Sequence, residues 1–408
     1  LGGGTADTYD DRAARGFVLA AGIATLILFG FGARTAGFDP RIGAIATVLL
    51  AFEVFTTLYH TYFVQEAWLA LFVWGFFFLA LQPEPKHRLG RLFAMGLLAG
   101  LAQATKETAP LYLGVAFIAV CLAERRKPNF RNLRGLTIGL VGWFIPVVAF
   151  YSAFGTQPQG LLDALHTYTL QANRIAESPH AYPWWRYLQT LGLIHTSGPR
   201  WGQFILLGLT GFGTVLAFRP SASPALRATA FFVFTILIIH SAIPYKTPWL
   251  ILTPVLGFPL LAAHAITAIA GQSRRRFLLA LCLTSAAVAE SGWRSWLALD
   301  RYPGDARNPN FYEQPPRSFT RLAARLEQLQ TVLDRPLRIA VVSAEAAWPL
   351  PWYLRNATAV GYFETAPADP AAWDVIVWDL QMGEPASQLL TDRLVEFHGL
   401  RPNMVLEV

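Results

Sequence analysis

The sequence has few charged residues and almost no cysteine. Charged residues occupy 14% of its 408 positions, whereas roughly a quarter is usual in soluble proteins. The two cysteines, Cys121 and Cys282, both fall inside apolar runs, where a free cysteine behaves as a small buried hydrophobe. These features exclude a disulfide framework and a zinc site of recognisable spacing, and they argue against an ordinary soluble domain.

Long apolar blocks dominate instead. The chain is 54% hydrophobic with a mean hydropathy of +0.37. Short charged clusters separate the blocks, which is typical of a polytopic helical membrane protein. The net charge of +7 does not indicate nucleic-acid binding, because the basic residues gather at the ends of the blocks. We expect an α-helical membrane protein with about ten membrane helices in this chain, at residues 15–33, 43–60, 66–82, 91–104, 108–122, 135–154, 202–218, 227–243, 248–270 and 275–293.

The basic residues predict an orientation. One set of alternate connections carries Arg34 and Arg41; Lys86, Arg88 and Arg91; Arg125, Arg126, Lys127, Arg131 and Arg134; Arg219 and Arg227; and Arg274, Arg275 and Arg276. The short connections of the other set carry only Lys106 and Lys246, and the longer 155–201 connection adds Arg174, Arg186 and Arg200. Because cytoplasmic loops are rich in Lys and Arg, the first set is expected in the cytoplasm. This predicts a multi-pass protein of a prokaryotic cytoplasmic membrane, with everything after residue 294 outside.

The tail differs from the rest of the chain. Residues 318–333 carry leucines at helical spacing, and residues 337–342 and 373–378 have the composition of buried strands. We therefore expect two domains: a transmembrane domain at 1–296 and a small extracytoplasmic α/β domain at 297–408. The tail contains no Gly-rich phosphate loop and no nucleophile elbow, so a structural or substrate-capping role is expected for it.

The stretch Tyr245-Lys-Thr-Pro-Trp249 lies between two apolar runs. Pro244 and Pro248 stop the helices on either side, since proline lacks a backbone donor and disfavours helix in the preceding residue. Tyr245 and Trp249 favour the membrane–water interface. One cation, Lys246, would be held there beside free backbone amides, which suits an anion such as a phosphate. The alternative is an interfacial lysine that reaches toward water.

A second cation comes from Thr105-Lys-Glu-Thr108, which interrupts two apolar runs. A Lys–Glu pair at membrane depth usually faces the protein interior or a water-filled cavity. Lys106 and Lys246 together would form a two-cation cradle for a phosphate or diphosphate. The alternative is that Lys106 and Glu107 mark a turn at the surface.

Acidic, histidine and aromatic side chains near the same expected face supply further candidates. His60 and Glu66 stand at the outer end of a helix hairpin, where Glu66 could act as a general base or metal ligand, or could stabilise the start of the next helix. Glu53, two turns inside the second helix, is either functional or a buried neutral acid. Trp184 and Trp185 would stack on a sugar or lie in the interface. The histidines His60, His166, His180, His195 and His240 lack the spacing of a closed metal site, although an open divalent-cation site stays an alternative.

Three motifs carry a resemblance to a known family. They are Gly96-Leu-Leu-Ala-Gly-Leu-Ala-Gln-Ala-Thr-Lys-Glu-Thr108, Pro244-Tyr-Lys-Thr-Pro-Trp249 and Trp348-Pro-Leu-Pro-Trp-Tyr-Leu354. The chain resembles, over nearly its whole length, the flippase-activity-associated integral-membrane proteins, which are in turn similar to GT-C glycosyltransferases such as protein O-mannosyltransferases and ArnT. The resemblance implies a polyprenyl-phosphate-linked sugar, bound at the outer face and transferred to a protein or glycan acceptor of the cell envelope with inversion.

The resemblance also implies roles for single residues. Lys106 and Lys246 would stabilise the departing phosphate, and Glu66 or Glu107 would help to activate the acceptor. The principal carboxylate of the GT-C enzymes lies in the first outer loop, which we expect upstream of Leu1 in a longer protein. Where relatives carry an Arg in the second outer loop, this chain has Thr61-Tyr-Phe-Val64. We therefore expect a membrane glycosyltransferase, with a non-catalytic lipid-linked-sugar binder or flippase accessory as the alternative.

Overall fold

The computed structural model describes residues 11–83, 88–125, 133–177, 181–193, 199–305, 307–310, 317–333, 335–343 and 347–379. Its contacts divide the chain into two compact units. The larger comprises Asp11–Tyr302 with Ala306–Tyr312 and holds the apolar helices. The smaller includes Pro303–Asp305 and Glu313–Val408 and holds the strands.

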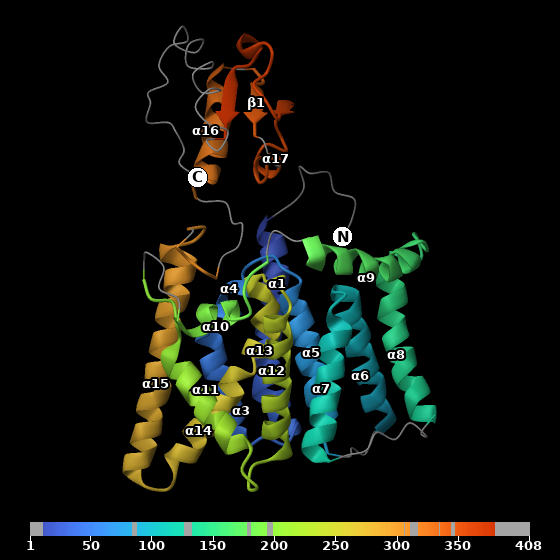
Figure 1. Ribbon diagram of the computed structural model, residues 1–408, viewed down its shortest axis with the longest axis vertical. Coiled ribbons are helices and arrows are strands. Elements are labelled where there is room, and N and C mark those ends of the chain that lie inside the picture. Colours follow the sequence, from blue (N-terminus) through green and yellow to red (C-terminus); the bar gives the residue numbers. More distant parts are fainter. Residues whose placement is uncertain are drawn as a thin grey trace. The chain divides into compact units, whose positions relative to one another are not determined.

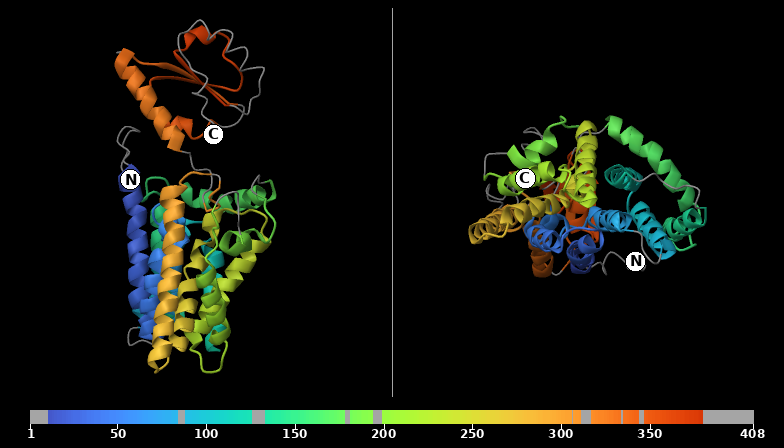
Figure 2. Two further views of the ribbon diagram at one scale, coloured as in Figure 1. Left: turned by 90° about the vertical axis from the view of Figure 1, so that its left-hand side faces the viewer. Right: turned by 90° about the horizontal axis from the view of Figure 1, so that it is seen from below.

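Helices form almost all of the larger unit, and those of the bundle run side by side in Figures 1 and 2. In chain order they are α1 (Asp11–Ile27), η2 (Leu28–Gly32), α2 (Ala33–Thr35), α3 (Pro40–Phe52), α4 (Val54–Tyr59), α5 (Glu66–Leu81), α6 (Arg88–Thr105), α7 (Ala109–Glu124), α8 (Leu133–Tyr151), α9 (Gly160–Glu177), α10 (Arg186–Leu188), η3 (Gln189–Leu193), α11 (Phe204–Ala217), α12 (Pro224–Ala242), η4 (Pro248–Ile251), α13 (Leu252–Val255), α14 (Phe258–Ala270), α15 (Arg274–Trp296) and η5 (Leu297–Arg301). Each of the ten ranges predicted from the sequence coincides with helix.

Four of these helical segments are long and apolar enough to cross a membrane: Arg12–Thr35, Leu133–Tyr151, Pro224–Ala242 and Pro248–Ala270. Four shorter apolar helices, α3, α5, α7 and α11, accompany them. The protein is therefore integral to a membrane, whereas a count of ten crossings stays a prediction.

Two predicted helices are interrupted. The range 43–60 is split at Glu53, whose backbone is extended (ψ 134°) and whose side chain caps α4. The range 248–270 consists of η4, α13 and α14 in succession. Prolines explain this second interruption in part, because each lacks an amide donor for the helix.

Close packing of backbones holds the bundle together at two places. A Cβ added to Gly96 of α6 would lie 1.9 Å from the carbonyl oxygen of Gly139 in α8, and one on Gly142 would lie 2.4 Å from that of Phe93. A Cβ on Gly213 of α11 would lie 1.8 Å from a backbone oxygen of α14. Only glycine permits these approaches, since any side chain would force the helices apart.

The connection at 155–201, predicted to be a loop, contains the 18-residue helix α9. Figure 1 shows α9 running across one end of the bundle, at a large angle to α8. Its apolar and polar residues alternate at helical spacing, which makes the helix amphipathic. An amphipathic helix of this kind has no long apolar run, and a search for such runs therefore misses it.

The smaller unit contains a parallel three-stranded sheet in the order β2-β1-β3, made by β1 (Arg338–Val342), β2 (Ala359–Phe363) and β3 (Val375–Trp378). Leucines of α16 (Arg317–Leu333) and of α17 (Leu350–Tyr353) pack on β1. The strands predicted at 337–342 and 373–378 are confirmed, and β2 was not predicted.

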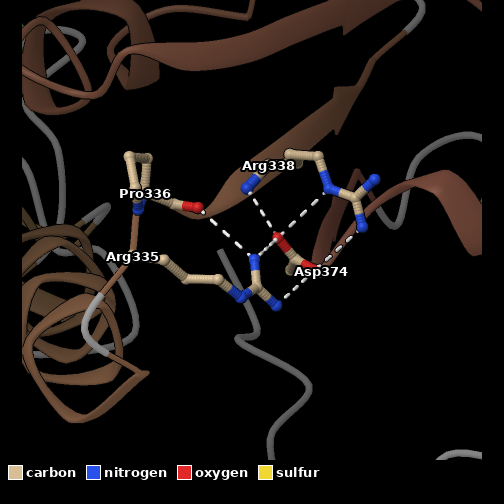
Figure 3. A network of polar contacts seen from close by, with 4 residues as sticks. All are labelled: Arg335, Pro336, Arg338 and Asp374. Atoms are coloured by element: carbon tan, nitrogen blue, oxygen red, sulfur yellow. Dashed lines mark hydrogen bonds and ion pairs between the residues drawn. The ribbon is translucent and has the colours of Figure 1, made fainter.

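One carboxylate joins the starts of the neighbouring strands β1 and β3 (Figure 3). Asp374, directly before β3, accepts hydrogen bonds from Arg335 at 2.8 and 3.0 Å and from the backbone amide of Arg338 at 2.9 Å. The guanidinium groups of Arg335 and Arg338 hold the pKa of the Asp374 carboxyl well below its usual range.

Candidate functional site

A cavity of about 1070 Å³ lies at one end of the bundle. Residues of α1, α5, α6, α8, α9 and α12 contribute to its walls, together with the connections between α6 and α7 and between α12 and α14. The described lining residues that carry polar groups are Gln65, Glu66, Trp68, Thr105, Lys106, Glu107, Thr108, Tyr168, His240, Tyr245 and Trp249. Segments far apart in the sequence therefore meet here, and the cavity combines a small polar region with a larger apolar one.

An ion pair marks the polar region. Glu66 is the first residue of α5, and its carboxylate pairs with the ammonium of Lys106, which follows directly after α6. Both side chains are nearly buried, with 5% and 11% of their surface exposed. The carboxylate also benefits from the positive end of α5, as the helix-start interpretation predicted. Glu107 lines the same cavity, so three of the predicted site residues come together.

Lys246 has a different environment. It is 3% exposed, and its ammonium donates to the carbonyl oxygens of Ser241, at 2.9 Å, and of Ile243, at the end of α12. It also lies 5.8 Å from the ring centre of Tyr187. Lys246 is not among the described lining residues of the cavity. The structure thus places one of the two predicted cations, Lys106, in the cavity wall, whereas the other occupies the carbonyl end of a helix.

The segment 181–187, called the strap below, packs against the Tyr245-Lys-Thr turn. Ala181 forms an isolated antiparallel bridge with Tyr245, the amide of Tyr182 donates to Pro244, and the hydroxyl of Tyr187 donates to the carbonyl of Thr247 at 2.9 Å. These contacts fix Tyr245 where it lines the cavity.

The tryptophans of this strap point elsewhere. Trp184 and Trp185 are 59% and 45% exposed, and their rings meet edge to face at 5.7 Å. They are not among the described lining residues, whereas Trp249 is. Their exposure fits the interface alternative better than a stacking surface inside the cavity.

His60 also lies outside the described cavity wall. It is 3% exposed, its Nδ1 contacts the carbonyl oxygen of Thr56 at 2.8 Å, and its ring packs against Gly22 of α1. Of the remaining predicted histidines, His180 and His195 lie outside the described residues.

Glu53 has a structural explanation. It is fully buried and accepts hydrogen bonds from the amides of Phe55 and Thr56, from the hydroxyl of Thr56, and from the side chain of Gln203. Gln203 in turn accepts from the hydroxyl of Ser291 in α15. The carboxylate therefore starts α4 and joins it to α11 and α15.

The cavity wall contains one arrangement that the sequence did not indicate. The Nε2 atom of His240 lies 2.8 Å from the hydroxyl of Tyr112, which donates its own proton to the carbonyl of Leu250 at 2.9 Å. Tyr112 is in α7, so its approach to His240 depends on the packing of α7 against α12. No spacing in the sequence reveals this pairing.

The described residues contain no cluster of three or more His, Cys, Asp or Glu side chains that could hold a metal ion. The lining residues Glu66, Glu107 and His240 leave an open divalent-cation site as a prediction.

Comparison with known proteins shows what this fold is similar to. No protein-family model and no curated protein sequence matches the chain. ArnT from Cupriavidus metallidurans in the apo state matches with a TM-score of 0.57 and 16% identity, over 90% of this chain and 75% of ArnT. This chain has an ArnT-like fold. The structure of ArnT bound to undecaprenyl phosphate matches equally well, over 88% of this chain and 72% of ArnT.

The ArnT-like fold agrees with the GT-C-like architecture that the resemblance implied. An oligosaccharyltransferase from Archaeoglobus fulgidus also matches, with 12% identity over 85% of this chain and 50% of that protein, but its TM-score of 0.46 is too low to support an argument. At these identities the likeness concerns the fold alone, and the assignment to the flippase-associated family stays a prediction.

Proposed function

We propose that this chain is a membrane glycosyltransferase that uses a polyprenyl-phosphate-linked sugar. The observation that carries the proposal is the composition of the cavity wall, where Lys106 stands beside a long apolar surface. A polyprenyl phosphate has the matching parts, an anionic head and an apolar chain. The ArnT-like fold supports the same ligand class, since ArnT has been solved with undecaprenyl phosphate bound.

The chemistry would be a single displacement at the anomeric carbon. A nucleophile of the acceptor forms a bond to this carbon, the carbon–oxygen bond to the phosphate breaks, and the polyprenyl phosphate leaves with the electron pair. Lys106 would stabilise the charge that develops on the leaving phosphate. A carboxylate takes the proton of the acceptor, and Glu66 or Glu107 would serve or assist in this role.

Glu66 and the phosphate would compete for Lys106. In the free protein the ammonium is paired with Glu66. Burying an ion pair costs desolvation of both charges, and a phosphate that approaches Lys106 adds a second anion to the same cation. Binding of the donor would therefore loosen Glu66 and leave its carboxylate available near the reacting groups.

We place the reaction at the outer face of the membrane. The cavity is lined by residues of α9 and of the connection between α6 and α7. Figure 1 shows these two segments at the end of the bundle opposite the connections between α11 and α12 and between α14 and α15. Those connections carry Arg219 and residues 274–276, all arginine, and basic connections are expected in the cytoplasm. A donor at the outer face is consistent with an acceptor in the cell envelope.

A lipid-linked-sugar binder or flippase accessory is the second candidate. Lys106 is the one lysine or arginine among the described lining residues, and Lys246 is held by carbonyl oxygens instead. A site with a single cation can bind a phosphate without assisting its departure strongly.

Native mass spectrometry in mild detergent tests the ligand class. We expect undecaprenyl phosphate to bind the wild type, and Lys106→Met to weaken binding by about 10- to 150-fold, the value of a hydrogen bond to a charged group. The double variant Lys106→Met/Glu66→Gln removes the pair without leaving a buried charge. Arg219→Met, an exposed site at the other end, is the matched control and should bind normally.

Release of free undecaprenyl phosphate from a sugar-loaded lipid, in the presence of cell-envelope acceptors, separates the two candidates. Turnover supports the transferase. Tight binding without turnover supports the binder, and a wild type that binds no polyprenyl phosphate excludes both.

A further inference from the structure

The cavity wall contains a histidine whose proton position is fixed by its neighbours. His240 lines the cavity and is 3% exposed, and its ring contacts Tyr112, which is 1% exposed. The Tyr112 hydroxyl has one proton and lies within hydrogen-bond distance of two partners, the Nε2 of His240 and the carbonyl oxygen of Leu250. A carbonyl oxygen can only accept, so the tyrosine proton goes to Leu250.

The tautomer of His240 follows from this. Because the Tyr112 proton is used on Leu250, the hydroxyl oxygen must accept from His240, and Nε2 must carry the proton. In the neutral ring the other nitrogen, Nδ1, is then a hydrogen-bond acceptor. Tyr112 therefore acts as a positioning residue that keeps one defined acceptor on the ring.

The chemistry of this acceptor selects its ligand. An ionised phosphate oxygen has no proton to donate, so it cannot satisfy Nδ1. A sugar hydroxyl donates readily. His240 lines the same cavity as Lys106, which is assigned to the phosphate under the proposed function. The sugar of a polyprenyl-phosphate donor is directly bonded to that phosphate, so its hydroxyls would be the donors nearest to His240.

We propose that His240, oriented by Tyr112, accepts a hydrogen bond from a hydroxyl of the donor sugar and so distinguishes a sugar-loaded polyprenyl phosphate from the bare lipid. This inference rests on the proposed function and deepens it, since it adds a specificity-determining residue to the same cavity. Lys106 would bind the phosphate that both lipids share, whereas His240 would contribute only when the sugar is present.

Two substitutions separate the two ring nitrogens. The terminal amide of glutamine reaches the place of Nε2, so His240→Gln keeps a partner for Tyr112 and loses the acceptor at Nδ1. The shorter asparagine places its amide near Nδ1, so His240→Asn keeps an acceptor for the ligand and loses the contact with Tyr112. If His240 only packs against Tyr112, the glutamine variant should bind the sugar-loaded lipid more tightly than the asparagine variant does. The proposal predicts that the asparagine variant binds it more tightly.

The experiment compares two sets of probes by native mass spectrometry of the full chain in detergent. One is undecaprenyl phosphate, and the other is a panel of undecaprenyl-phosphate-linked glucose, mannose, galactose and aminoarabinose. For the best sugar-loaded lipid we expect His240→Gln to lose about 3- to 10-fold in affinity, the value of one neutral hydrogen bond, and His240→Asn to lose less. Binding of the bare lipid should stay unchanged in both, which also shows that the variants are folded.

Tyr112→Phe tests the positioning role. Without the hydroxyl, the ring proton is free to move to Nδ1, so we expect part of the same loss for the sugar-loaded lipid. The ¹⁵N spectrum of histidine-labelled protein should show the Nε2–H tautomer for the resonance that disappears in His240→Gln. In Tyr112→Phe this resonance should shift toward a mixture of tautomers.

The outcomes separate the inference from the function on which it rests. A wild type that binds neither kind of lipid overturns the proposed function and the inference together. A wild type that binds both, with a His240→Gln variant that loses equally on both or on neither, overturns the role of His240 alone. A glutamine variant that outperforms asparagine on the sugar-loaded lipid also overturns it.

Discussion

Replacing Glu53 should destabilise the larger unit more than removing an exposed helix cap does. Glu53→Ala leaves the buried amides of Phe55 and Thr56 without their acceptor and also deprives Gln203 of a partner. A buried donor without a partner costs about 1–3 kcal/mol, so two amides give a loss of about 2–6 kcal/mol in the free energy of unfolding. Glu53→Gln keeps one oxygen and turns the other position into a donor, so about 1–3 kcal/mol should be lost.

Asp39 supplies the matched control, because its carboxylate caps α3 by accepting from the amide of Arg41 at 2.8 Å in an exposed position. Asp39→Ala should cost about 0.5–2 kcal/mol. Thermal unfolding of all variants in one detergent should rank wild type first, then Asp39→Ala, Glu53→Gln and Glu53→Ala. A Glu53→Gln variant as stable as the wild type would refute the assignment of Glu53 to structure and return it to the list of functional acids.

Three further predictions follow from the described contacts. The lowered pKa of Asp374 means that its carboxylate stabilises the folded smaller unit at pH values above the unfolded pKa of about 4 and loses this effect as the pH falls through the folded pKa. Asp374→Asn should therefore lower the free energy of unfolding by about 1 kcal/mol at pH 7 and by progressively less in acid, as measured by thermal unfolding of the full chain. An equal loss at pH 7 and in acid would contradict this. Gly213→Ala should destabilise by about 1–3 kcal/mol because its Cβ would meet the backbone of α14, whereas Gly208→Ala, in the same helix with open space around it, should be neutral or stabilising; equal effects would disprove the close approach. Lys246→Ala should weaken binding of undecaprenyl phosphate less than Lys106→Met does, since its ammonium is bound to carbonyl oxygens; a larger effect would mean that Lys246 enters the cavity when the ligand binds.

The positions of the helices could be predicted because burial in a membrane requires long apolar runs, and these runs are visible without any partner. The two strands at 337–342 and 373–378 were found for a similar reason, as short apolar runs with turn residues around them. β2 escaped because Ala359-Val-Gly-Tyr-Phe363 is half-buried along its length and contains a glycine, which weakens the strand signal.

Part of the cavity wall was predictable, where charged residues occur in apolar runs. Lys106 and Glu66 are conspicuous because a charge in an apolar run is costly, and the structure brings them together. The direction of a long side chain is a different matter. Lys246 is also a lysine between two apolar runs, but its side chain reaches back to the end of α12, the preceding helix, because carbonyl oxygens are available there.

The contacts of Tyr112 and Glu53 could not be predicted from the sequence. The contact between Tyr112 and His240 joins positions 128 residues apart, and the bond from Gln203 to Glu53 joins positions 150 apart. Such contacts depend on how the helices pack. No periodicity along one segment contains that information.

The glycine contacts between α6 and α8 have a consequence for how the cavity can change shape. Because the backbones of Gly96 and Gly139 are in close contact, no side chains lie between the two helices at this point that could rearrange and let the helices move apart. The hydroxyl of Tyr151 fastens the far end of α8 to the carbonyl of Gln103, one turn before Lys106. We therefore expect α6 and α8 to move as one rigid unit, with Lys106 at its end. We therefore expect any widening of the cavity to come from the walls formed by α1, α5 and α12, not from a separation of α6 and α8.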